Sequence, residues 1–217
     1  MYKTVVFDLD GTLLNTLTDL ADAGNRLCRK YSWPTHERQA YRYFVGNGIP
    51  KLVERLAPAD QRTPAVLEAA LADFKRDYGQ HLRDTTAPYP GIPEMLAKLK
   101  ANGVQLAVFS NKADALAKEV VKDYFGTQYF MIVRGQMTGV APKPAAEGTN
   151  ALLQALHADP ASTLYVGDSN VDVETAHNAN LPCCGAVWGF RTREELNAAG
   201  AEYLAENSDE LYDVIMK

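Results

Sequence analysis

The sequence is poor in several features that would place it in other classes of protein. Its only cysteines are Cys28, Cys183 and Cys184, an odd number without Cys-x-x-Cys spacing, so neither a disulfide framework nor a cysteine zinc site is expected. No apolar run approaches the length of a membrane-spanning helix, and the first residues lack the pattern of a signal peptide. We therefore expect a protein of a reducing compartment, located in the cytoplasm, without a membrane partner.

An excess of positive charge is also missing. The chain has 22 Lys and Arg residues against 27 Asp and Glu residues, which gives a formal net charge of -5. Binding to nucleic acid requires a basic surface that neutralises phosphates, so nucleic acid is not an expected partner. An anionic substrate would need a local positive site, such as a metal ion, a lysine or a helix N-terminus.

The pattern that is present alternates short apolar runs with helical periodicity. Continuous apolar runs of this length are typical of strands buried on both faces of a parallel sheet. Strands are predicted at 4–7, 106–109, 163–166 and 181–187, and helices at 94–100, 113–124, 148–157 and 171–179. This alternation indicates an α/β, doubly wound sheet.

Residues 15–87 differ from the rest of the chain. They are helical in pattern, highly charged and without convincing strands, and Pro88-Tyr89-Pro90-Gly91 marks the return to the sheet-bearing part. The sequence therefore predicts a helical domain at 15–87, inserted into a core made of residues 1–14 and 88–217.

Polar groups follow three of the predicted strands. The first strand runs into Asp8-Leu9-Asp10-Gly11-Thr12, the second into Ser110-Asn111-Lys112, and the third into the segment 167–172, which carries Asp168 and Asp172. A lone aspartate at a strand end is usually a turn or helix cap. Open parallel sheets bind ligands at the carboxyl ends of their strands, so three polar strand ends together predict a functional site.

The spacing of the aspartates indicates a metal site. Asp8 and Asp10 are two residues apart and point to the same side of a strand, and Asp168 and Asp172 share one face of a helix. Two such charges about 4 Å apart repel by roughly 4 kcal/mol at an effective dielectric of 20, and a divalent cation would relieve that repulsion. Carboxylate oxygens without His or Cys favour Mg²⁺ over zinc. No histidine lies at these strand ends, so a Ser-His-Asp triad has no support.

These motifs together resemble those of the haloacid dehalogenase (HAD) superfamily. Asp8-x-Asp10-Gly11-Thr12 resembles its first motif and Ser110 its second, while Lys143-Pro144 resembles the third and Gly167-Asp168-x-x-x-Asp172 the fourth. All four occur in the family's order. The resemblance implies a Rossmann-like doubly wound parallel sheet with central strand order 3-2-1-4-5 and an α-helical cap inserted after the first strand. Asp10 argues against dehalogenation, because the dehalogenases of the family carry an aromatic residue there.

The resemblance also implies a mechanism for phosphoryl transfer. Asp8 would be the nucleophile that forms an aspartyl-phosphate, and Asp10 would be the general acid and then the general base. Mg²⁺ would be held by Asp8, by the backbone carbonyl of Asp10 and by Asp168, and Asp172 would either bind it or hold its ligands in place.

Three further residues would bind the phosphoryl oxygens. These are Ser110, Asn111 and Lys143, and Lys143 would also neutralise charge beside Asp8. The implied activity is hydrolysis of phosphomonoesters.

The inserted domain carries a second resemblance. The segment 44–52, which contains Gly46-Asn47-Gly48, is similar to the cap segment of phosphoglycolate phosphatases, although a plain turn between helices is the alternative. A small phosphorylated metabolite, with 2-phosphoglycolate leading, is therefore the expected substrate. The role of Lys51 is open, and residues 188–191 either line the site entrance or form a structural turn.

Other activities stay open at this point. A phosphomutase of the β-phosphoglucomutase type shares the first motif, and pyrophosphatases and nucleotidases belong to the same superfamily. A catalytically silent binding module on this fold is disfavoured because the chain retains Asp8, Asp10, Ser110, Lys143 and Asp168. The chain could act as a monomer or a homodimer.

Overall fold

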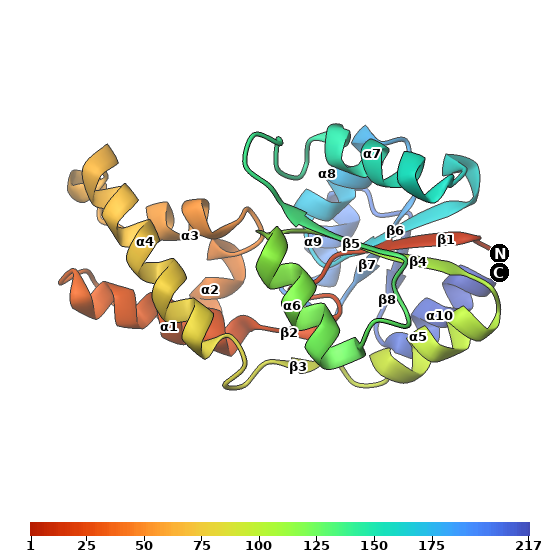
Figure 1. Cartoon of the computed structure of the whole chain (residues 1–217), viewed down its shortest axis with the longest axis horizontal. Coiled ribbons are helices and arrows are strands. Elements are labelled where there is room, and N and C mark those ends of the chain that lie inside the picture. The colour runs from red at the N-terminus through yellow and green to blue at the C-terminus, as the bar shows by residue number, and fades with distance from the viewer. The chain divides into compact units, whose positions relative to one another are not determined.

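A computed structural model of the chain describes residues 1–217 (Figure 1). The residues divide into two compact units, one formed by Met1–Leu14 with Pro88–Lys217 and the other by Asn15–Ala87. The chain passes between the units through two short strands, β2 (Leu14–Asn15) and β3 (Ala87–Pro88), which pair with each other. No helix of the chain combines the length and the apolar character needed to cross a membrane.

The larger unit is built on one six-stranded sheet with the order β5-β4-β1-β6-β7-β8. Every pair of neighbouring strands is parallel. The strands are β1 (Thr4–Phe7), β4 (Gln105–Ala113), β5 (Ile132–Gln136), β6 (Thr163–Gly167), β7 (Cys183–Ala186) and β8 (Tyr203–Ala205). The predicted fold class and central strand order are confirmed. The strands β5 and β8 were not predicted from the sequence.

Helices alternate with these strands along the chain. They are α5 (Ile92–Ala101), α6 (Asp114–Phe125), α7 (Ala146–Leu156), α8 (Asn170–Asn178), α9 (Arg193–Ala198) and α10 (Ser208–Met216), with a short 3₁₀ helix, η2 (Pro160–Ser162). Figure 1 shows α7 and α8 on one face of the sheet and α5 and α10 on the other. Helices on both faces bury the sheet, which explains why its central strands read as continuous apolar runs.

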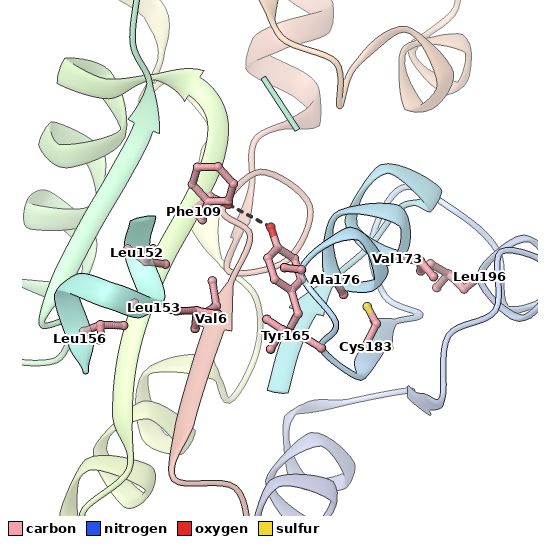
Figure 2. Packing of buried hydrophobic residues seen from close by; sticks show 13 residues of the cluster. Val6, Phe109, Leu152, Leu153, Leu156, Tyr165, Val173, Ala176, Cys183 and Leu196 are labelled. Atoms are coloured by element: carbon pink, nitrogen blue, oxygen red, sulfur yellow. Dashed lines mark hydrogen bonds between the residues drawn. The ribbon is translucent and has the colours of Figure 1, made fainter. Parts of the chain in front are cut away.

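The core on the α7 and α8 side is drawn in Figure 2. Val6, Phe109 and Tyr165 project from three neighbouring strands toward Leu152 of α7 and Ala176 of α8, and all of these side chains are buried. Tyr165 keeps its hydroxyl satisfied by donating a hydrogen bond to the carbonyl oxygen of Phe109, 3.4 Å away. Burying a large apolar side chain contributes about 1.5–3 kcal/mol, so this packing fixes the central strands on which the polar strand ends are mounted.

The two chain ends of this unit lie together. The backbone N–H of Tyr2 donates to the carbonyl oxygen of Ile215 at 2.9 Å, and its hydroxyl lies 3.2 Å from that of Tyr203. Figure 1 shows the N and C termini side by side. Because Tyr2 precedes β1, both termini lie at the amino end of the central strand.

The smaller unit consists of helices. They are α1 (Leu17–Lys30), α2 (Arg38–Phe44), α3 (Ile49–Leu56), the short 3₁₀ helix η1 (Ala59–Gln61) and α4 (Pro64–His81). Thr63 caps α4 by accepting a hydrogen bond from the N–H of Val66. Asp19 is buried on α1 and accepts hydrogen bonds from the N–H and hydroxyl groups of both Thr85 and Thr86. These bonds anchor the end of the unit to its first helix.

Candidate active site

The predicted site residues of the larger unit gather because their strands are neighbours. Asp8 directly follows β1, Ser110 lies near the end of β4, and Asp168 directly follows β6. Since β1 pairs in parallel with both β4 and β6, the carboxyl ends of all three strands meet at one edge of the sheet. The topology therefore brings Asp8, Ser110 and Asp168 to one place, although they are far apart in the sequence.

Three carboxylates form the centre of this edge. Oxygen atoms of Asp8, Asp168 and Asp172 all lie within 4.8 Å of one another, and all three residues are buried. Burial raises the pKa of Asp8 to about 7, with Lys143 opposing the rise and the negative charge of Asp172 adding to it. Burial, together with the charges of Asp172 and Asp8, also raises the pKa of Asp168 well above its usual range. The ionised cluster is costly on its own and has only oxygen donors, so it fits a hard divalent cation.

Lys143 supplies the buried positive charge of the site. Its Nζ lies 2.9 Å from Oδ1 of Asp8 and 2.7 Å from Oδ1 of Asp172, and its side chain is 1% exposed. Burial lowers the pKa of this ammonium, but the charges of Asp172 and Asp8 outweigh that effect and raise it well above its usual range. Lys143 is therefore a fixed cation beside Asp8. Its Nζ also lies 5.8 Å from the centre of the Tyr165 ring, which packs against it.

Asn111 holds the backbone of Lys143. Its side-chain oxygen accepts a hydrogen bond from the N–H of Lys143 at 2.8 Å, and its side-chain nitrogen donates to the carbonyl oxygen of the same residue at 3.2 Å. The amide thus spans from β4 to the loop before α7. These contacts give the Asn111 side chain a positioning task, and its predicted contact with phosphate stays a prediction.

Asp172 is engaged by both of its oxygens. Oδ1 pairs with Lys143, while Oδ2 accepts hydrogen bonds from the hydroxyl and the N–H of Ser169 at 2.7 and 3.1 Å. Ser169 and Asp172 form the capping box that begins α8. Of the two roles that the sequence left open for Asp172, these contacts favour holding Lys143 and the helix start over binding a cation directly.

Asp168 is held by two loops. Its Oδ1 accepts from the hydroxyl of Thr12 at 3.2 Å and its Oδ2 from the backbone N–H of Phe190 at 2.7 Å. Gly11 and Gly189 press against it so closely that a Cβ on either would lie within 2.3 Å of an Asp168 side-chain atom. The loop after β7 is fastened in turn, because the indole N–H of Trp188 donates to the carbonyl oxygen of Thr12 at 3.0 Å.

Asp10 lies beside this cluster but has a different environment. Its side chain is 20% exposed, and its two oxygens lie 3.1 and 3.3 Å from Nζ of Lys112, whose own side chain is 2% exposed. Ser110 is buried, and its hydroxyl oxygen accepts from the backbone N–H of Lys112 at 3.3 Å. The ion pair between β4 and the loop after β1 was not anticipated from the sequence.

The predicted cap segment belongs to the helical unit. Gly46, Asn47 and Gly48 connect α2 to α3, with φ angles of 105° at Gly46 and 84° at Gly48 that favour glycine. Arg55 of α3 organises the connection, since its guanidinium donates to the side-chain oxygen of Asn47 at 2.9 Å and to the carbonyl oxygen of Phe44 at 2.8 Å. The segment is thus a fixed turn that leads into the N-terminus of α3.

The sequence reading missed several residues that build the site. The sequence predicts no role for Lys112 beyond its place in a strand end or for Thr12 beyond its place in a motif, and it leaves residues 188–191 as either a site entrance or a structural turn. In the structure this loop stabilises the position of Asp168, because Phe190 donates a hydrogen bond to Asp168 and Trp188 donates one to the backbone of Thr12. Glycine followed by an aromatic residue directly after a strand was the one available signal for a close approach of this loop.

Comparison with known proteins places the chain in a family. The model of the haloacid dehalogenase-like hydrolase family matches residues 5–186. A phosphoglycolate phosphatase from Chromobacterium violaceum is 31% identical over 216 residues, which cover 98% of this chain and 96% of that protein. A phosphoglycolate phosphatase from Mesorhizobium japonicum is 31% identical over 191 residues, covering 87% and 84% of the two chains.

A solved structure of a candidate phosphoglycolate phosphatase from Lactobacillus delbrueckii superposes with a TM-score of 0.93 and 28% identity, covering 99% of this chain and 98% of that one. The chain belongs to the haloacid dehalogenase-like hydrolases. Within that family it is a phosphatase, and the predicted enzyme class is confirmed.

Proposed function

We propose that this phosphatase hydrolyses small phosphomonoesters through an aspartyl-phosphate on Asp8, with Mg²⁺ as its cofactor. The observation that carries the proposal is the ion pair of 2.9 Å between Asp8 and the buried Lys143 at the meeting point of three strand ends. A carboxylate nucleophile needs a neighbouring positive charge to approach a phosphate dianion, and Lys143 supplies it without leaving the protein interior.

Each side chain at the site has a task in this reaction. Asp8 attacks phosphorus, and the leaving alcohol takes a proton from Asp10, which then removes a proton from the water that hydrolyses the aspartyl-phosphate. Ser110 and Lys143 bind the phosphoryl oxygens and neutralise their charge, while Asn111 keeps Lys143 in place. Positioning and electrostatics of this kind account for most of the catalysis in phosphoryl transfer.

The cation would be held by Asp8, the backbone carbonyl of Asp10 and Asp168, and Asp172 would steady that arrangement through Lys143. When bound, Mg²⁺ supplies positive charge that offsets the charge on the transferring phosphoryl group. The buried carboxylates fit this role, because burial and then the negative charge of Asp172 raise the pKa of both Asp8 and Asp168, and a bound cation would favour their ionised forms.

Phosphate release from p-nitrophenyl phosphate tests the nucleophile and the cofactor together. Asp8→Asn keeps the shape of the side chain and removes the carboxylate, so turnover should fall to background while the circular dichroism spectrum stays unchanged. The unaltered enzyme should require Mg²⁺ and lose activity in EDTA. Turnover by Asp8→Asn well above background would reject Asp8 as the nucleophile, and full activity in EDTA would reject the metal.

We further propose 2-phosphoglycolate as the preferred substrate, read by the turn at Gly46-Asn47-Gly48. The turn leads directly into α3, and the N–H groups at a helix N-terminus favour an anion such as the carboxylate of this substrate. Arg55 fixes the turn in advance, which reduces the entropy lost on binding. Lys51 pairs with Glu54 at 2.8 Å on the exposed surface and has no part in this proposal. The two relatives named as phosphoglycolate phosphatases support the same substrate.

Comparing two substrates in one variant tests the turn. Gly46→Val should lower kcat/KM for 2-phosphoglycolate at least tenfold more than for p-nitrophenyl phosphate, which has no carboxylate to bind. Gly103→Val is the matched control, since Gly103 also has a positive φ and open space around it but lies in the other unit. Equal losses on both substrates would assign the turn to folding alone. A kcat/KM for pyrophosphate, a nucleotide or a sugar phosphate far above that for 2-phosphoglycolate would reject the substrate and leave the phosphatase intact.

A further inference from the structure

Lys112 has a position that the proposed reaction does not explain. It lies on β4 two residues after Ser110, in the stretch between Phe109 and Ala113 where the pairing of β4 with β5 shifts register. Its side chain is 2% exposed, yet its ammonium lies at 3.1 and 3.3 Å from the two oxygens of Asp10. A buried lysine thus reaches both oxygens of the side chain that handles protons in the proposed reaction.

Burying an ammonium costs several kcal/mol, which an ion pair offsets only when the geometry is good. Asp10 is 20% exposed and could satisfy its carboxylate with water, so the carboxylate itself does not need a buried cation. The contact with both oxygens fixes the carboxylate against rotation, which a single hydrogen bond or a water molecule would not do.

We propose that Lys112 is a positioning residue that aims the carboxyl group of Asp10 at the leaving-group oxygen. This inference rests on the proposed function, in which Asp10 exchanges protons with the alcohol and with water. A proton donor must lie within hydrogen-bond reach of its target, and an error of about 1 Å in a reacting group can cost on the order of 10²-fold in rate. Lys112 itself touches neither the phosphate nor the alcohol in this role.

The backbone supports the same arrangement. The N–H of Lys112 donates to the hydroxyl oxygen of Ser110 at 3.3 Å, so the lysine also contacts the residue assigned to phosphate binding. Gly135 of β5 lies against the carbonyl oxygen of Lys112, where an added Cβ would lie at 2.4 Å. The backbone of Lys112 thus contacts both Ser110 and Gly135, which limits the movement of the lysine relative to Asp10.

Dependence on the leaving group separates positioning of Asp10 from general support of the fold. Phenyl phosphate and p-nitrophenyl phosphate have similar size, but the phenol leaves less readily and depends more on a donated proton. Lys112→Met should therefore lower kcat/KM, which reports the steps up to departure of the alcohol, at least tenfold for phenyl phosphate and less than threefold for p-nitrophenyl phosphate. Lys112→Arg, which keeps a charged donor, should restore part of the loss. Lys118→Met is the matched control, because Lys118 is exposed and pairs with Asp114 at 2.7 Å. This variant should turn over both substrates at the rate of the unaltered protein.

A double-mutant cycle decides whether Lys112 acts through Asp10. In an Asp10→Asn background, Lys112→Met should lower kcat/KM for phenyl phosphate by less than a further threefold, because the carboxyl group that Lys112 positions is no longer present. Equal losses on both substrates, or losses that multiply in the double variant, would overturn the inference. If Asp10→Asn itself shows no preference for either substrate, the proposed role of Asp10 fails and the inference falls with it. If Asp10→Asn is selective and Lys112→Met is not, only the inference fails.

Discussion

Replacing the proposed nucleophile should stabilise the protein when metal is absent. The carboxyl group of Asp8 has an ordinary pKa of 3.8 and a pKa of about 7 in the folded chain, chiefly because it is buried. Between these two values the folded state binds more protons than the unfolded state, so this group makes stability fall as the pH rises through that window. Each pH unit is worth about 1.4 kcal/mol, and the full difference therefore amounts to roughly 4 kcal/mol.

Asp8→Asn removes this cost because an amide does not ionise, and Lys143 keeps Asp172 as its partner at 2.7 Å. In EDTA the free energy of unfolding of the variant should exceed that of the unaltered protein by at most about 1 kcal/mol at pH 4.5 and by up to about 4 kcal/mol at pH 8. Relaxation of the structure around the site would reduce both differences. Urea denaturation followed by circular dichroism measures the difference. Asp213→Asn, at an exposed position, is the control and should change stability by less than about 0.5 kcal/mol.

In the presence of Mg²⁺ the unaltered protein should be more stable than Asp8→Asn, because the cation binds to and stabilises the protein that still has the Asp8 carboxylate. The reasoning would be refuted if Asp8→Asn were no more stable than the unaltered protein at pH 8 in EDTA, or if its advantage were the same at both pH values. Either result would mean that the buried carboxylates are already balanced without a metal.

Two further substitutions probe the groups around the carboxylates. Gly189→Ala places a Cβ about 2.2 Å from Cβ of Asp168 and should weaken Mg²⁺ activation by about 10–100-fold, as a metal titration of activity would reveal, whereas Gly79→Ala in open space should not. Lys143→Met leaves Asp8 and Asp172 without their buried cation and should lower the free energy of unfolding by about 3–5 kcal/mol at pH 8 in EDTA, and by less at pH 5, which lies below the raised pKa of Asp8. A loss below about 1 kcal/mol in urea denaturation, or one independent of pH, would show that Lys143 does not balance them.

The central sheet could be predicted because its strands are buried on both faces. The strands β1, β4 and β6 all appear as apolar runs, and their shared direction is what brings Asp8, Ser110 and Asp168 to one edge. The strand β5 escaped prediction because it lies at the edge of the sheet, where Arg134 and Gln136 are tolerated in place of apolar side chains. The strand β8 is three residues long and also lies at an edge, which leaves too little pattern to recognise.

The contacts of the site were less predictable than its members. The pairing of Lys112 with Asp10 joins residues 102 apart in sequence, and no local periodicity encodes such a contact. The loop after β7 contacts Asp168 through the backbone N–H of Phe190. Every residue except proline has a backbone N–H, so the residue type does not indicate this contact. Motifs therefore predicted which residues gather at this edge, whereas the contacts that hold them required the folded arrangement.

The meeting of the two chain ends decides how the protein can be attached to a surface. Tyr2 is bonded to Ile215 at the amino end of β1, while Asp8 lies at the opposite end of the same strand. Asp8 lies six positions after Tyr2, which corresponds to roughly 20 Å of extended chain at about 3.3 Å per residue. A peptide tag on either terminus would therefore attach the molecule by the same edge of the sheet and leave the edge that carries Asp8 facing away from the support. A tag at either terminus would give the same orientation on the support. A short peptide linker between the two termini could circularise the chain.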